Sequence, residues 1–276
     1  MNTLEKIIAD KYLEVEERKK QRTVADLEKS SFFSRPTLSL KSFLLNPNKS
    51  GIITEFKRKS PSKGLINGTS SVEVVSKGYE QAGASALSIL TDHFYFGGST
   101  ADLELARGQV AIPILRKDFV VDEYQILEAK SMGSDCILLI AAALSPGQVN
   151  SLATFAQSLG LEVLLEVHNL KELEDSFCDP LDVVGVNNRN LKTFEVSLDT
   201  SLELVDRIPK QVVKISESGI SDPSTLVAFR KVGFDGFLIG ENFMKTPCPE
   251  RAALEFIEEY SRLMGENRVG KAGYGN

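Results

Sequence analysis

The stretch GIITEFKRKSPSKG (51–64) decides how the rest of the chain is interpreted. It begins as an apolar run suited to a buried strand and changes within a few residues into a charged turn that ends in glycine. Side chains alternate along a strand, so Ile53, Glu55 and Lys57 share one face. An ordinary solvated loop does not need opposite charges at this density. The stretch therefore indicates a strand that ends at an active site.

Seven further runs resemble the first in length and in their content of Ile, Val and Leu. The eight runs are GIITEF from 51, ALSIL from 86, IPIL from 112, CILLIAA from 136, EVLLEV from 162, DVVGVN from 182, QVVKIS from 211 and DGFLIG from 235. Each is followed by a longer amphipathic segment, such as PGQVNSLATFAQSLG from 146. Continuous apolar strands that alternate with helices predict a parallel sheet with helices on its outer face.

Eight strand–helix units predict an α/β fold of the (β/α)8 barrel type, whose usual size is roughly 250 residues. A doubly wound sheet is the alternative, but it usually has fewer strands and a glycine-rich first turn, and no GxGxxG follows the first run. Helices are predicted to start at Asp122, Ser145 and Asp222. Glycines 83, 133, 160 and 233 are predicted to end four helices.

The barrel is predicted to occupy residues 49–264. Residues 1–48 form a predicted helical extension, in which Leu4, Ile7, Ile8, Tyr12 and Val15 lie on one stripe. Two positions are open for this extension: it plugs or flanks the bottom of the barrel, or it covers the active site. Residues 265–276 are glycine-rich and polar, and they are predicted to be a flexible tail.

The composition argues against several classes of protein. A net charge of −6 argues against a dedicated nucleic-acid binder. Three scattered cysteines without CxxC spacing predict reduced thiols in the cytoplasm. No apolar stretch reaches the roughly 20 residues that a membrane span needs, and the N-terminus does not resemble a signal peptide. Two histidines are too few for a His-rich site, so no metal is predicted.

Four later runs end in polar side chains as the first one does. These are Lys117 in the third run, Glu166 in the fifth, Asn187 and Arg189 in the sixth, and Glu217 in the seventh. In a barrel the carboxyl ends of the strands meet at one mouth, where barrel enzymes carry their chemistry. A single polar residue there could be a solvated strand end, but five such strands at one edge indicate a site. Because unpaired buried charges are costly, these groups must pair with one another or meet a charged ligand.

An anion site is predicted at the same mouth. SESGI (216–220) follows the seventh run, and IGENFM (239–244) follows the eighth. Loops at these two places, with glycine NH groups and a helix start, form the usual phosphate site of such barrels. Ser60 could add a hydroxyl from the first loop, and a flavin phosphate could use the same cradle.

Together these segments resemble the indole-3-glycerol phosphate synthase family over about residues 3–262. The resemblance rests on EFKRKSPSKG, LSILTD with YFGGS, ILRKDFVVDEYQI, LLEVHN, GVNNRNL, KISESGI and FLIGENFM, all in family order. Related phosphate-binding barrels, such as phosphoribosylanthranilate isomerase, share the late phosphate loops but lack the pair EFKRKSPS and LRKDF.

The resemblance implies a reaction and a set of roles. The substrate would be 1-(o-carboxyphenylamino)-1-deoxyribulose 5-phosphate, which closes to an indole with loss of carbon dioxide and water, without a metal or an organic cofactor. Lys117 is implied as the general acid and Glu166 as the general base, with Glu55, Lys57, Asn187 and Glu217 around them. Arg189 and Ser218 match pocket positions, Phe96, Phe119 and Leu238 match the apolar bed for the anthranilate ring, and Ser60, Ser218, Gly219 and Gly240 match the phosphate ligands.

One position departs from the family, which often has serine where this chain has Glu241. A carboxylate repels a phosphate, so the side chain of Glu241 is expected to turn away while its backbone NH binds. His93 and His168 are expected to be structural, because the family pattern does not use them.

Two other interpretations stay open at this point: another phosphosugar barrel enzyme, such as phosphoribosylanthranilate isomerase, or a non-catalytic barrel that binds a phosphorylated ligand. The predicted partner is a small phosphorylated molecule, with neither nucleic acid nor membrane. The sequence leaves monomer or homodimer undecided.

Overall fold

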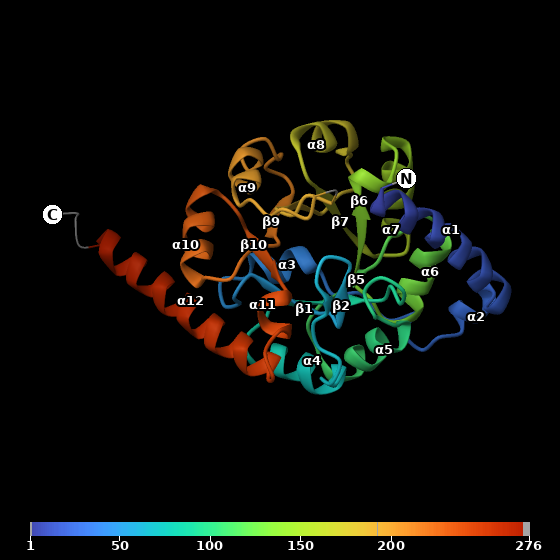
Figure 1. The fold of residues 1–276 in the computed structure, drawn as a ribbon, viewed down its shortest axis with the longest axis horizontal. Coiled ribbons are helices and arrows are strands. Elements are labelled where there is room, and N and C mark those ends of the chain that lie inside the picture. The colour runs from blue at the N-terminus through green and yellow to red at the C-terminus, as the bar shows by residue number, and fades with distance from the viewer. Residues whose placement is uncertain (1, 192, 273–276) are drawn as a thin grey trace.

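The chain folds into a closed barrel of eight parallel strands, seen nearly end-on in Figure 1. The computed structural model describes residues 2–191 and 193–272. The barrel strands are β1 (Ile52–Phe56), β4 (Ala86–Leu90), β5 (Ile114–Lys117), β6 (Cys136–Ile140), β7 (Glu162–Val167), β8 (Val183–Asn187), β9 (Val213–Glu217) and β10 (Gly236–Ile239). Each of the eight predicted runs is therefore a strand.

Closure of the sheet excludes the doubly wound alternative. Strand β1 pairs with β10 on one side, through Ile53 and Leu238, and with β4 on the other, through Ile53 and Ala86. Both pairings are parallel, as are all the others around the ring. A doubly wound sheet keeps two free edges, and this barrel has none.

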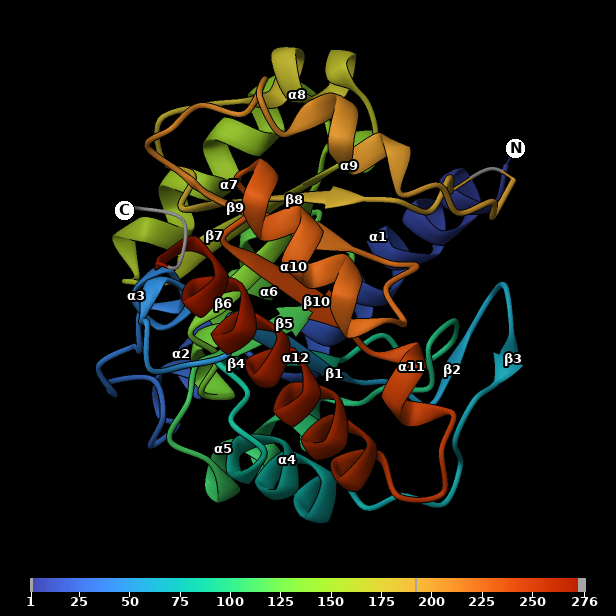
Figure 2. The ribbon, with the colours of Figure 1, turned by 90° about the vertical axis from the view of Figure 1, so that its left-hand side faces the viewer.

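Helices surround the barrel and also precede it (Figures 1 and 2). They are α1 (Thr3–Gln21), α2 (Val24–Glu28), α3 (Leu40–Leu45), α4 (Val72–Gln81), α5 (Thr100–Gln109), α6 (Glu123–Ser131), η1 (Ala141–Ala143, a 3₁₀ turn), α7 (Pro146–Ser158), α8 (Leu170–Ser176), α9 (Asp199–Leu204), α10 (Pro223–Val232), α11 (Glu241–Met244) and α12 (Pro249–Ala272). The predicted N-caps Asp122, Ser145 and Asp222 are confirmed. The four predicted terminal glycines all have positive φ, the left-handed conformation that commonly ends a helix. No helix within the described residues is long and apolar enough to cross a membrane.

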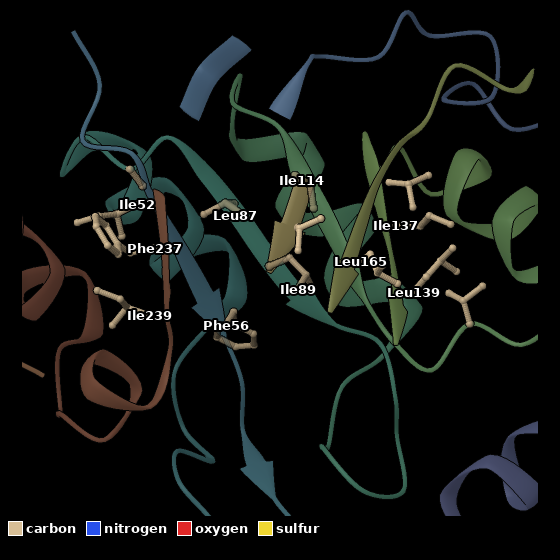
Figure 3. Packing of buried hydrophobic residues seen from close by; sticks show 14 of the residues in the cluster. Ile52, Phe56, Leu87, Ile89, Ile114, Ile137, Leu139, Leu165, Phe237 and Ile239 are labelled. Atoms are coloured by element: carbon tan, nitrogen blue, oxygen red, sulfur yellow. The ribbon is translucent and has the colours of Figure 1, made fainter. Parts of the chain in front are cut away.

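The strands separate two apolar layers because their side chains alternate. One layer lies between the barrel and its helices, and Figure 3 shows part of it, including Ile52, Leu87, Ile114 and Phe237. The other fills the barrel, with members such as Ile53. The inner layer is apolar along most of the barrel, and a group of charged side chains takes its place at the carboxyl ends of the strands.

The N-terminal extension takes both of the positions that the sequence left open. Leu40 and Leu44 of α3 are buried with the barrel interior, so α3 closes the bottom. Leu4 and Ile7 of α1 instead line the cavity at the opposite mouth. Figure 2 shows α3 at one end of the barrel and α1 towards the other.

Two local features differ from the sequence-based expectations. The loop after β1 contains a two-stranded hairpin, β2 (Lys59–Ser60) and β3 (Gly64–Leu65), which projects at the mouth in Figure 2. The segment predicted to be a tail from residue 265 is instead helical as far as Ala272, and residues 273–276 lie outside the described residues. Arg262 pairs with Glu259 and Glu266, which stabilises this part of α12.

Candidate active site

Charged side chains from opposite sides of the barrel meet at its mouth. Lys117, at the end of β5, places Nζ 2.6 Å from Oε2 of Glu217 and 3.2 Å from Oε2 of Glu166. The side chain of Lys117 is 13% exposed, and those of the two glutamates are almost fully buried. An ammonium between two carboxylates can both release and recover a proton, which is the arrangement that acid–base catalysis needs.

A second ion pair lies beside this group, at the carboxyl end of β1. Lys57 Nζ lies 2.6 Å from Oε1 of Glu55, and the hydroxyl of Ser88 donates to Oε2 of the same carboxylate at 3.2 Å. The Glu55 carboxylate packs on the backbone of Gly240, where an added Cβ would lie 2.6 Å from Oε1. Gly240 therefore makes room for the Glu55 carboxylate, a role that the sequence did not indicate.

Gly185 has the same function on β8. A Cβ at this position would overlap Oε1 of Glu217, which projects into the barrel from the neighbouring strand β9. Within the described residues this oxygen is buried and has no hydrogen-bond partner. An unpartnered buried oxygen carries a free-energy cost, and it points to a group that is completed by a ligand or a proton.

Burial and neighbouring charges separate the proton affinities of the three central groups. Burial lowers the pKa of Lys117, but Glu217 and Glu166 outweigh it, so that pKa lies above its usual range. Burial raises the pKa of Glu166, but Lys117 and His168 outweigh it, so that carboxylate stays ionised. Burial dominates at Glu217 and, with the repulsion from Glu166, raises its pKa to about 7 despite Lys117. The site thus holds one firmly ionised carboxylate and one that titrates near neutrality.

An apolar wall lies against these charges. The rings of Phe96 and Phe119 are tilted by 44° with centroids 6.0 Å apart. With Leu238 they line the same cavity as Lys117 and Glu166, and Ile7 of α1 also contributes to it. The three residues predicted to form an apolar bed are therefore together, beside the charged groups.

A second cavity, lined by glycines, adjoins the first. It is bordered by Gly219 and Gly240 and shares Lys57, Ser218 and Arg189 with the first cavity. Ser218 and Gly219 both have positive φ, 68° and 76°, so successive residues take the left-handed conformation and turn the loop sharply. The buried side chain of Asn188 holds this turn by donating to the carbonyl of Ser218 at 3.1 Å.

The first loop contributes differently from the prediction. Ser60 lines the first cavity but is not among the residues that border the glycine-lined one. Ser62 lines both, and its hydroxyl lies 3.4 Å from that of Ser60. Sequence reasoning missed Ser62 although it lies only two residues further along SPSKG, because the short hairpin that aims it was not predicted.

The expectation for Glu241 is wrong. Its carboxylate does not turn away but lines both cavities, with Oε2 3.3 Å from Arg189 and Oε1 3.7 Å from Lys63. The carboxylate thus faces two cations, Arg189 and Lys63, and stays partly exposed. Arg189 is further placed by the side chain of Asn187, which accepts a hydrogen bond from its backbone NH at 2.9 Å.

Helix α1 is fastened over the mouth by a buried lysine that sequence analysis overlooked. Lys11 Nζ lies 2.8 Å from Asp92 and 3.0 Å from Asp118, and all three side chains are almost completely buried. Asp118 directly follows Lys117, so the fastening is adjacent to the central ammonium. A lysine on the apolar stripe between Ile7 and Val15 was the signal that could have revealed it, because a buried lysine needs acidic partners.

Comparison with known proteins shows the family of the chain. The family model for indole-3-glycerol phosphate synthase matches residues 4–256, most of the chain. The chain belongs to this family. Curated proteins named indole-3-glycerol phosphate synthase include one from Bacteroides thetaiotaomicron, 47% identical over 92% of this chain and 97% of its own length. Another, from Salinibacter ruber, is 42% identical over 96% of this chain and 99% of its own length.

A solved structure with a different name has a similar fold. Thiamine phosphate pyrophosphorylase from Pyrococcus furiosus superposes with a TM-score of 0.56, over 80% of this chain and 99% of its own, at 16% identity. At that identity the likeness shows the barrel fold alone.

The residues that the family resemblance implied are brought together by the structure. Those implied for catalysis and for the apolar bed line the first cavity, and Ser218, Gly219, Gly240 and Glu241 line the second. Within the described residues, no group of three or more His, Cys, Asp and Glu is arranged to hold a metal ion.

Proposed function

We propose that the chain is an indole-3-glycerol phosphate synthase in tryptophan biosynthesis and that these two adjoining cavities are its active site. It is a lyase that closes 1-(o-carboxyphenylamino)-1-deoxyribulose 5-phosphate to the indole, with release of carbon dioxide and water. The observation that carries the assignment is one continuous site with an ammonium between two carboxylates, an aromatic wall beside them and a glycine-lined cavity at one end. The substrate has a matching order of groups: an aromatic ring, a reacting ketone and a phosphate.

Lys117 acts as the general acid in ring closure. Attack of the aromatic ring on the ketone carbon places negative charge on the ketone oxygen, and the ammonium donates a proton to it. The positive charge that remains on the anilino nitrogen and ring is stabilised by Glu166. Glu217, 2.6 Å from Lys117, is suited to return a proton to the lysine because its pKa lies near neutrality.

The two ends of the substrate are held by different cations. Lys57 holds the carboxylate that leaves as carbon dioxide, from its place in the first cavity beside Glu55. Arg189, Lys63 and the loops of Gly219 and Gly240 hold the phosphate in the second cavity. The placement of Ser60 and the cytoplasmic location remain predictions.

Incubation with the carboxyphenylamino-deoxyribulose phosphate, followed by indole fluorescence, tests the assignment. We expect indole formation in a buffer with a chelator and no added cofactor. Folded protein that forms no indole overturns the proposed function, and turnover of phosphoribosylanthranilate instead would favour an isomerase.

A further inference from the structure

His168 directly follows β7, two residues after Glu166, and its ring lies between two carboxylates. Nε2 is 3.4 Å from Oε1 of Glu166, and Nδ1 is 3.0 Å from Oε2 of Glu172 on α8. The side chain is only 9% exposed. The contact to Glu166 is an ion-pair contact, because Nε2 has no partner with hydrogen-bond geometry among the described residues.

Glu172 fixes the orientation of this ring. Its Oε2 also accepts the backbone NH of His168 at 2.8 Å, and its Oε1 accepts the side-chain NH of Asn169 at 2.7 Å. Asn169 in turn caps α8 by accepting the backbone NH of Glu172 at 2.9 Å. The carboxylate is thus immobilised at the first turn of the helix, and the ring that it binds cannot rotate freely.

This geometry selects one protonation state. The Glu172 carboxylate accepts a hydrogen bond from Nδ1–H, so a neutral ring would turn the lone pair of Nε2 towards the Glu166 carboxylate and repel it. A ring protonated on both nitrogens instead faces each carboxylate with a donor. Burial lowers the pKa of His168, but Glu166 and Glu172 outweigh it and raise that pKa to about 10.

His168 does not line the first cavity, so it acts through Glu166 and not on the substrate. It borders a separate cavity between α1 and the loop after β8, which Glu5, Arg189 and Glu195 also border. We propose that His168, clamped by Glu172, is a positioning residue whose imidazolium holds the Glu166 carboxylate in place for the reaction. This inference rests on the proposed function of the same site.

The contact between His168 and Glu166 also affects the position of the Lys117 ammonium between its two carboxylates. Its shorter contact is with Glu217, at 2.6 Å, against 3.2 Å to Glu166. With Oε1 occupied by the imidazolium, Glu166 attracts the ammonium less strongly. Without His168, the ammonium would move towards Glu166, and both the acid and the carboxylate would be misplaced for ring closure.

Kinetics of matched variants test the proposal. We expect His168→Phe, which keeps a ring but no charge, to lower kcat about tenfold or more, with KM changed less than threefold. Glu172→Gln keeps the shape of the side chain that holds the His168 ring, and it should lower kcat by a smaller factor. His93→Phe is the control, since this exposed ring lies outside both cavities. If His168→Phe changes kcat no more than the control does, or changes KM alone, the proposal fails.

Imidazole nitrogen NMR tests the protonation state without any substrate. The chain has two histidines, so the His93→Phe spectrum assigns the His168 signals. We expect both nitrogens of His168 to be protonated at pH 8, and Glu172→Gln to favour the neutral ring. A neutral His168 at pH 8 in the unaltered chain overturns the proposal. Since this measurement needs no turnover, a chain that forms no indole but shows the protonated ring would contradict the proposed function alone.

Discussion

Lys117 and Glu217 are 100 residues apart in the chain, yet their charged atoms lie 2.6 Å apart at the mouth of the barrel. Both side chains are largely buried, and Glu166 completes the group at 3.2 Å from the same ammonium. In a closed barrel, β5 and β9 face one another across the interior, so inward-pointing residues at their ends meet. This contact brings together a proton donor and a carboxylate that can restore its proton.

Replacement of Lys117 with alanine should abolish most turnover while leaving substrate binding largely intact. Loss of a general acid costs roughly 10²–10⁴-fold in rate. Steady-state kinetics give kcat, and titration calorimetry of the inactive variant with the carboxyphenylamino-deoxyribulose phosphate gives the dissociation constant. A variant with near-normal kcat would remove Lys117 from the mechanism.

Glu217→Gln should change how stability depends on pH. The pKa of Glu217 is raised by burial from 4.5 to about 7, so the folded state binds this proton more tightly than the unfolded state does. Its contribution to stability is therefore fully present below about pH 4.5 and is lost as the pH rises towards 7. Urea unfolding measures the free energy of unfolding, which should decrease less from pH 5 to pH 8 in the variant than in the unaltered chain. An equal decrease in both proteins would contradict the raised pKa of Glu217.

Ser62→Ala should raise KM more than Ser60→Ala does. Ser62 borders the glycine-lined cavity as well as the first one, whereas Ser60 borders the first cavity only. Both variants remove one hydroxyl from the same hairpin, so each serves as a control for the other. For Ser60→Ala we still expect KM to rise more than kcat falls. Equal effects of the two replacements on KM would show that the phosphate is bound elsewhere.

Glu241→Gln should tighten phosphate binding. The carboxylate pairs with Arg189 at 3.3 Å and faces Lys63 at 3.7 Å, so it competes with an incoming phosphate for both cations. Partly exposed ion pairs contribute about 0–1 kcal/mol, so KM and the inhibition constant for inorganic phosphate should fall by up to about fivefold. Activity assays with increasing phosphate measure both. A rise in KM would mean that Glu241 supports the loop and does not compete.

The barrel and most of its site could be predicted because their signals are local in the chain. Eight apolar runs with alternating faces determine which side chains point inward, and closure then places Glu55, Lys117, Glu166 and Glu217 at one mouth. Cap residues such as Asp222 were readable because a helix end is stabilised by residues within a few positions of it.

Other features could not be predicted from the sequence, because they depend on contacts between residues that are far apart in the chain. The sequence shows neither that Glu241 faces Arg189 nor that Gly185 makes room for Glu217. The contacts of His168 could not be predicted for the same reason, since they depend on Glu172 and on the direction of the Glu166 side chain.

The sequence by itself determined the number of barrel strands, the face of each of these strands that lines the barrel and the family to which the chain belongs. Only the tertiary structure decided the protonation state of the buried carboxylates. Burial and the spacing of charges set the pKa of a carboxylate, and neither is a property of the residue alone. Glu166 and Glu217 end equivalent strands in the sequence, yet the partners of the first keep it ionised while burial brings the second near neutrality.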